Sequence, residues 1–127
     1  GRRVVFDNEF SQGKRRLPIN GLVWMSDRDT MFQQVEEKLK AGFTTLKLKV
    51  GAIDFDQECA LLADIRTRFS PEEVILRVDA NGAWTPDDAT HKLRDLAQFD
   101  LHSIEQPIRP RQLEALAELC RTSPLPV

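Results

Sequence analysis

The chain has 127 residues, of which 41% are hydrophobic and 30% are charged, as in ordinary globular domains. Its net charge of −2 argues against the basic surface typical of proteins that bind nucleic acid or anionic membranes. No apolar stretch reaches the roughly 20 residues that a membrane-spanning helix requires, and the N-terminus does not resemble a signal peptide. Cys59 and Cys120 lack metal-ligand spacing. We expect them to be buried free thiols in a cytoplasmic protein.

Most of the chain alternates short apolar runs with amphipathic helical patterns. The first run covers residues 19–25, and either Ser26 or Asp27 can cap the helix that follows. Gly42 stands where a left-handed residue commonly ends a helix. The second run covers residues 44–50. On the first helix, the spacing predicts an apolar face made of Phe32, Val35 and Leu39.

The same alternation continues through the next two units. Asp54 can cap the second helix, and a third apolar run covers residues 74–80. Thr85, followed by Pro86 and Asp88, is close to a capping-box start for the third helix. The second helix has a predicted apolar face of Phe55, Cys59, Leu62, Ile65 and Phe69. The predicted apolar face of the third helix consists of Leu93, Leu96 and Ala97.

The last part of the chain contains a short fourth run, residues 102–106, and a fourth helical pattern. Residues 125–127 resemble the start of a fifth strand. The predicted apolar face of the fourth helix holds Leu113, Leu116, Ala117 and Cys120.

Strands that alternate with helices of this length predict an α/β fold of parallel βαβ units, either an open sheet or part of a (β/α)₈ barrel. The second strand places Leu46 and Leu48 on one face and Lys47 and Lys49 on the other. Central strands of an open sheet are covered by helices on both faces and should be apolar on both. The pattern therefore favours a partial barrel of four βα units and the start of a fifth strand. A complete barrel needs about 250 residues.

Four charged residues fall at the C-terminal ends of three successive strands: Lys47, Lys49, Asp79 and Glu105. Barrels of this kind place their active sites at that edge. Asp79 follows Lys49 by 30 residues, and Glu105 follows Asp79 by 26, which is about one βα unit each. Alone, each residue has a plainer explanation, such as a solvent-facing lysine or an aspartate that begins a turn. Their shared position predicts that they meet at one site.

These residue types indicate a chemistry. Carboxylates without histidine or thiolate partners suit a hard cation, most plausibly Mg²⁺. A cation near a substrate carboxylate stabilises the negative charge that develops when an α-proton is removed. A lysine can take that proton only when it is neutral, and a second ammonium and a divalent ion nearby would lower its pKa. Mg²⁺ with a lysine base is the mechanism known for enolase-superfamily sites.

Three motifs carry a family resemblance. Lys47-Leu48-Lys49, Asp79-Ala80-Asn81 and Glu105-Gln106-Pro107 resemble the muconate-lactonizing branch of the enolase superfamily, over residues 18–127. Within that branch, residues 17–25 and 47–56 look most like the o-succinylbenzoate synthases of menaquinone biosynthesis.

The resemblance implies a Mg²⁺-dependent lyase, a dehydratase that acts on a small-molecule carboxylate. The reaction would be the syn dehydration of a succinyl-hydroxy-cyclohexadiene carboxylate to o-succinylbenzoate. Lys49 would be the base and Lys47 a supporting cation near the substrate carboxylate. Asp79 and Glu105 would be Mg²⁺ ligands, with Asn81 beside the site.

The resemblance also implies parts that these residues do not include. A third metal ligand and a further lysine of the family lie beyond Val127, and an N-terminal capping domain is absent. We interpret residues 1–16 as a linker or tail of that domain, and residues 17–127 as the N-terminal half of the catalytic barrel. We expect this chain alone to be inactive and to bind Mg²⁺ weakly. An exposed barrel edge favours pairing with another chain, as in a homo-oligomer or in a non-catalytic half-barrel kept for assembly.

Other functions fit some of the same features. A dipeptide epimerase or an N-acylamino acid racemase fits the motifs almost equally well, but needs a second base on the opposite face of the substrate. A receiver-type signalling domain also has alternating βα units and an aspartate that ends its third strand. That class expects an acidic pair after the first strand, where Met25-Ser26-Asp27 supplies one acid at most.

Overall fold

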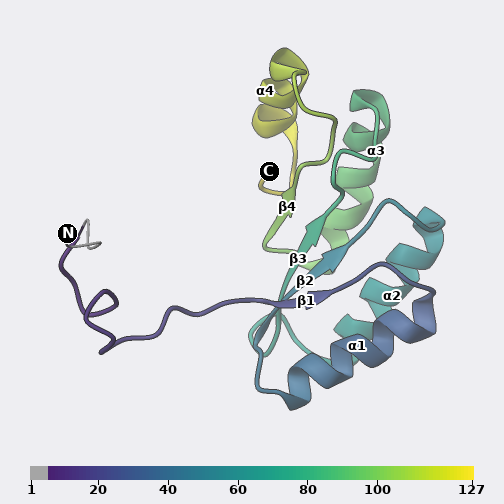
Figure 1. Ribbon diagram of the computed structural model, residues 1–127. Helices are drawn as coiled ribbons and strands as arrows, with labels where there is room; N and C mark the ends of the chain where they lie inside the picture. Colours follow the sequence, from purple (N-terminus) through teal and green to yellow (C-terminus); the bar gives the residue numbers. More distant parts are fainter. Residues whose placement is uncertain (1–5) are drawn as a thin grey trace.

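The computed structural model describes residues 6–127, and its ribbon alternates strands with helices (Figure 1). The elements, in chain order, are β1 (Gly21–Val23), α1 (Arg28–Lys40), β2 (Thr45–Lys49), α2 (Phe55–Arg68), β3 (Ile75–Asp79), α3 (Pro86–Leu96), the 3₁₀ helix η1 (Ala97–Phe99), β4 (Ser103–Glu105) and α4 (Leu113–Thr122).

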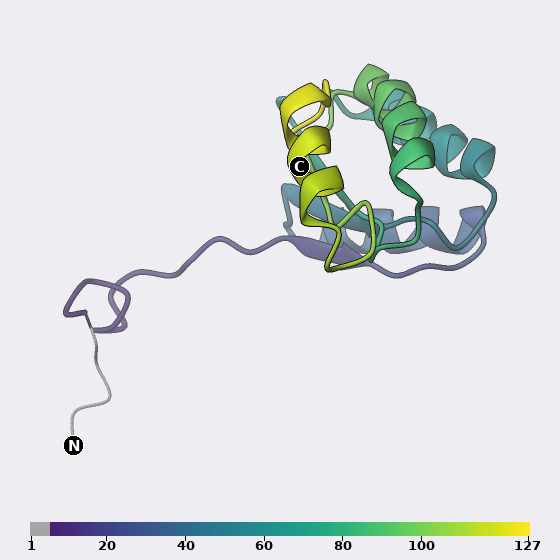
Figure 2. The same cartoon turned by 90° about the horizontal axis from the view of Figure 1, so that it is seen from above.

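The four strands form one parallel sheet in the order β1-β2-β3-β4, so each strand pairs with the next one along the chain. Sequential parallel pairing through helical crossovers is the arrangement of a (β/α)₈ barrel, of which this chain forms an arc. The predicted α/β fold is confirmed. Residues 6–20 extend away from the sheet in both views (Figures 1 and 2). The prediction for residues 1–16 falls partly on residues 1–5, which lie outside the described residues.

Local signals begin the first three helices as predicted. The side chains of Asp27, Asp54 and Thr85 accept hydrogen bonds from backbone N–H groups in the first turns of α1, α2 and α3. Gly42, with φ +88°, follows the end of α1 in the left-handed region that glycine adopts without strain. Short polar side chains and glycine thus place the helix ends.

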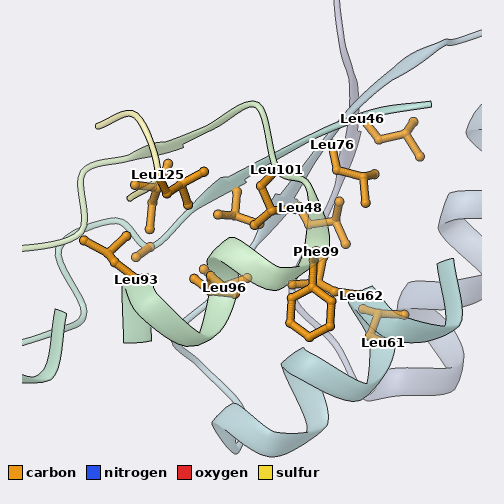
Figure 3. Close-up of a cluster of buried hydrophobic side chains, with 14 of the residues drawn as sticks. Leu46, Leu48, Leu61, Leu62, Leu76, Leu93, Leu96, Phe99, Leu101 and Leu125 are labelled. Atoms are coloured by element: carbon orange, nitrogen blue, oxygen red, sulfur yellow. The ribbon is translucent and has the colours of Figure 1, made fainter. Parts of the chain in front are cut away.

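The hydrophobic core lies between the sheet and helices α1, α2 and α3. Alternate strand residues, including Leu46, Leu48 and Leu76, are fully buried against the helices, and Figure 3 shows them beside leucines of α2 and α3. Met31 and Val35 are the buried residues of α1, whereas the predicted Phe32 and Leu39 pack at its margin. On α2 and α3 the buried apolar residues are Leu61, Leu62, Ile65, Ala89, Leu93 and Leu96.

Arg66 of α2 stabilises the end of the sheet where β3 and β4 begin. Its guanidinium donates to the carbonyl oxygens of Val74 at 2.8 Å, Phe99 at 2.8 Å and Asp100 at 3.0 Å. The rigid fork of five N–H donors allows one side chain to satisfy carbonyls from two separate loops. Arg66 therefore joins the segments that lead into β3 and β4.

The prediction for α4 is wrong in its details. Leu119 is the buried residue of this helix, whereas Leu113 is 77% exposed and Ala117 and Cys120 are exposed. Leu113, Leu116 and Cys120 border a cavity of about 610 Å³ beside the outer edge of β4. The helix is amphipathic as predicted, and Leu116 is partly buried against the core, but the described residues leave Leu113 and Cys120 exposed.

The predicted fifth strand does not form. The backbone N–H of Ile104 donates to the carbonyl oxygen of Pro126 at 2.8 Å, but residues 125–127 are not a strand. Proline has no backbone N–H, so Pro124 and Pro126 can accept but cannot donate the hydrogen bonds of a ladder. Leu125 is nevertheless buried against the core.

Both cysteines are free thiols, as predicted, although Cys59 is half-buried and Cys120 is exposed rather than buried. Burial raises the pKa of the Cys59 thiol to about 11. Within residues 6–127, no helix is long and apolar enough to cross a membrane.

The contacts of Arg66 generate a stability prediction. Arg66→Met should lower the free energy of unfolding by about 2–3 kcal/mol, because it removes charge-assisted hydrogen bonds to several carbonyls. Arg94→Met, at an exposed position near the end of α3, should change it by less than about 0.5 kcal/mol. Urea unfolding followed by circular dichroism measures both. Equal stabilities of the two variants would contradict the role of Arg66.

Candidate active site

The C-terminal ends of β2, β3 and β4 bring the predicted charged residues to one level of the sheet. In the parallel register, Lys49 lies opposite Asp79, and Asp79 lies opposite Glu105. Leu48 and Val78, one residue earlier, point to the other face and are buried in the core. The predicted convergence of the charged residues at one edge is therefore confirmed.

Asp79 stands at the centre of this cluster. Its side chain is only 1% exposed, and Oδ2 accepts from Nζ of Lys49 at 2.6 Å and lies 3.1 Å from Nζ of Lys47. Burial acts to raise the pKa of the Asp79 carboxyl, but hydrogen bonds from Lys49, the Asn81 backbone and Lys47 outweigh it. The pKa therefore lies below its ordinary value. Asp79 is a charged carboxylate despite its burial.

Lys47 bridges two carboxylates. Its Nζ donates to Oε2 of Glu105 at 2.9 Å and is also paired with Asp79. The hydrogen bond to Glu105 is the main cause that raises the pKa of Lys47, and Asp79 adds to it against the effect of burial. The two carboxylates, at hydrogen-bond and ion-pair distance, thus favour the ammonium form of Lys47.

Asn81 lies beside the site, as predicted. Its Oδ1 accepts from Nζ of Lys49 at 2.7 Å, and its backbone N–H donates to Oδ1 of Asp79 at 2.9 Å. Its φ of +48° is in the left-handed region, which asparagine tolerates better than most residues. Asn81 therefore holds both the lysine and the aspartate at the end of β3.

Backbone hydrogen bonds connect the loops that carry these side chains. The N–H of Val50 donates to the carbonyl of Asp79 at 2.9 Å, and that of Ala80 donates to the carbonyl of Glu105 at 3.1 Å. Gly82 donates to Gln106 at 2.7 Å. A Cβ at Gly82 would lie 3.1 Å from Cα of Arg109, so glycine permits this close approach. The strand ends are joined beyond the regular sheet.

The donor set fits a hard divalent cation. Asp79, Glu105 and the Asn81 amide offer oxygen atoms, and two of these groups are negatively charged. The carboxylates already attract positive charge, since both contact ammonium groups. Within residues 6–127 there is no cluster of three histidine, cysteine, aspartate or glutamate side chains suited to a metal. The described residues therefore offer two carboxylates and one amide oxygen, fewer ligands than a complete site for such a cation needs.

His91 and His102 are exposed and take no part in the cluster, and His102 Nδ1 contacts Ser103 Oγ at 2.9 Å. Trp84 is a packing residue, 7% exposed, with its ring edge-on to Phe55.

The sequence analysis missed one residue near the cluster, Glu58. It is 3% exposed, and its Oε1 accepts from the N–H of Gly51 at 2.5 Å, just beyond the end of β2. The available signal was a carboxylate three residues after Phe55 on an otherwise apolar helical stripe. Such an acid is rarely buried without a specific set of partners.

The chain is similar to known enzymes over most or all of its length. It is 54% identical over 127 residues to o-succinylbenzoate synthase of Desulfotalea psychrophila and 39% identical over 92 residues to the hydrophobic dipeptide epimerase of Enterococcus faecalis. The structure of o-succinylbenzoate synthase from Thermosynechococcus elongatus, complexed with Mg in the active site, matches with a TM-score of 0.77 and 30% identity.

The coverage of these matches is unequal. The alignments include 100%, 72% and 87% of this chain, but only 34%, 25% and 35% of the three relatives. The chain thus spans a quarter to a third of the length of the curated relatives it matches. The family model described as enolase C-terminal domain-like matches residues 30–127. The predicted resemblance is confirmed, and the chain belongs to the enolase C-terminal domain-like family.

Proposed function

We propose that this chain supplies one half of the active site of a Mg²⁺-dependent enzyme that removes a proton α to a substrate carboxylate. The observation that carries the proposal is the convergence of Lys47, Lys49, Asp79, Asn81 and Glu105 at the ends of three adjacent strands. Residues 17–127 would be the N-terminal half of the barrel, and residues 1–16 a linker to a capping domain.

Each residue would have a distinct role. Lys49, which donates to Asp79 and Asn81 in this structure, would have to be neutral to take the α-proton at Nζ. Lys47 would remain an ammonium beside the substrate carboxylate, in keeping with its raised pKa. Asp79 and Glu105 would hold Mg²⁺ through their oxygen atoms, and Asn81 would orient Lys49. The bound metal would supply stabilisation of the negative charge that develops on the substrate carboxylate.

The reaction we favour is dehydration of a succinyl-hydroxy-cyclohexadiene carboxylate to o-succinylbenzoate. The 54% identity to the Desulfotalea psychrophila synthase over the whole chain supports it. Dipeptide epimerisation is the second candidate, supported by 39% identity to the Enterococcus faecalis enzyme. Both reactions begin with loss of an α-proton, so the residues of this chain could serve either one.

Two hybrid enzymes can separate these candidates. The 127 residues replace the aligned part of the Desulfotalea psychrophila synthase in one, called the synthase hybrid, and the 92 aligned residues replace their counterpart in the Enterococcus faecalis epimerase in the other. We expect dehydration by the first hybrid and much weaker epimerisation by the second. Both proteins are checked for folding by thermal melting. If both hybrids fold and the epimerase hybrid is the more active of the two, epimerisation becomes the favoured reaction.

Loss of the proposed base should abolish turnover. Lys49→Ala in the synthase hybrid should lower kcat by about 10²–10⁴-fold, the usual contribution of a positioned general base. Lys40→Ala, an exposed lysine of α1, is the matched control and should leave kcat unchanged. Steady-state kinetics with saturating Mg²⁺ measure both variants. Turnover that survives in folded Lys49→Ala would place the base elsewhere.

Loss of a proposed ligand should weaken metal binding. Asp79→Asn in the synthase hybrid should lower Mg²⁺ affinity by at least about tenfold, since even outer-shell partners of a metal site contribute that much. Asp87→Asn, an acidic residue in the first turn of α3, is the control. Isothermal titration calorimetry with MgCl₂ gives the dissociation constants. Equal affinities in the two variants would exclude Asp79 as a ligand.

A further inference from the structure

Glu58 is a buried acidic residue that the chemistry proposed above does not use. Among the described residues it shares deep burial with one other charged side chain, Asp79. A carboxylate removed from water is costly unless hydrogen bonds replace its hydration. The partners of Glu58 therefore indicate what this side chain does.

Those partners are backbone amides of a single loop. The N–H of Gly51 donates to Oε1 at 2.5 Å. The amides of Ala52 and Ile53 belong to the same loop and act on the pKa of the carboxyl in the same sense. Burial raises the pKa of Glu58, and these three amides counteract part of that effect. No ion pair joins Glu58 to a cation within the described part of the chain.

The loop that Glu58 contacts follows β2, the strand of Lys49, and packs against the loop that follows β3. Gly51 comes two residues after Lys49 and has φ +92°. A Cβ on Gly51 would lie 2.6 Å from Cβ of Ala83 and 3.4 Å from Nε1 of Trp84. Ala83 and Trp84 follow Asn81 at the end of β3. The backbone of the β2 loop is therefore packed directly against the β3 loop.

Side chains at the start of α2 and on α3 also pack against the loop that follows β3. Phe55, at the start of α2, meets Trp84 edge to face, with ring centroids 6.2 Å apart. Nζ of Lys92, on α3, lies 3.9 Å from the centroid of the Phe55 ring and 5.7 Å from that of Trp84. The start of α2 thus contacts the β2 loop through Glu58 and the β3 loop through Phe55.

We propose that Glu58 is a positioning residue for the site: it holds the backbone at Gly51 against Ala83 and Trp84, and so keeps Lys49 aligned with Asp79 and Asn81. The catalytic meaning of this role rests on the proposed function. The alignment itself is a property of the fold and can be measured without turnover. When Glu58 is removed, the Gly51 amide loses its acceptor and the Lys49 side chain is held less firmly.

The first test compares Glu58→Ala, Glu58→Gln and Val35→Ala in the synthase hybrid. Glu58→Ala should lower kcat by about tenfold or more, as outer-shell substitutions do, with KM nearly unchanged. Glu58→Gln should recover part of the loss, because its amide oxygen still accepts from Gly51. Val35→Ala removes buried volume in α1 and controls for a general loss of stability. If Val35→Ala, at a similar Tm, loses as much kcat as Glu58→Ala, the positioning role is wrong.

The second test uses the 127-residue chain and needs no activity. Acetic anhydride labels free amines, and mass spectrometry gives the ratio of labelling at Lys49 to labelling at the exposed Lys40. Glu58→Ala should raise this ratio severalfold, because Lys49 leaves its partners more often, whereas Val35→Ala should not. An unchanged ratio in Glu58→Ala would overturn the positioning role. An inactive hybrid with Glu58 intact would instead count against the proposed reaction, and the labelling would still decide the role of Glu58.

Discussion

The geometry of the whole site depends on one buried oxygen, Oδ2 of Asp79, which is paired with two ammonium groups. A carboxylate at this depth would be neutralised without such partners, and the lysines keep it charged. The carboxylate in turn holds both lysine side chains at contact distance. Removal of either the carboxylate or the lysines would leave the remaining charge unpaired. The ion pairs, as well as the fold, therefore hold the charged side chains in place.

The sheet supplies the framework that makes this pairing possible. Parallel registers place Lys49, Asp79 and Glu105 side by side, and strand alternation sends Leu48 and Val78 to the opposite face. The same two-residue period thus builds the core on one face and the polar site on the other. A shift of one residue in the β2–β3 pairing would separate the ion pairs and expose core leucines together. Packing and chemistry are tied to the same register.

Much of this arrangement was predictable because it follows from short-range patterns. Strand alternation and helix caps gave the order of elements, and the spacing of Lys49, Asp79 and Glu105 indicated their convergence. Other features depend on partners that no local pattern specifies. Periodicity shows that α4 has an apolar face around Leu113, but not whether the chain covers it. The burial of Glu58 depends on backbone amides of a preceding loop, which carry no side-chain signature.

Arg66 and the site lie at opposite ends of the sheet. Its guanidinium joins the segments that enter β3 and β4, while the charged cluster occupies the ends where these strands exit. Residues around the cluster can therefore change during evolution without loss of the Arg66 hydrogen bonds at the other end of the sheet. Such a scaffold can exchange one reaction for another over evolutionary time at little cost in folding. Relatives named as a synthase and as an epimerase are both similar to this chain.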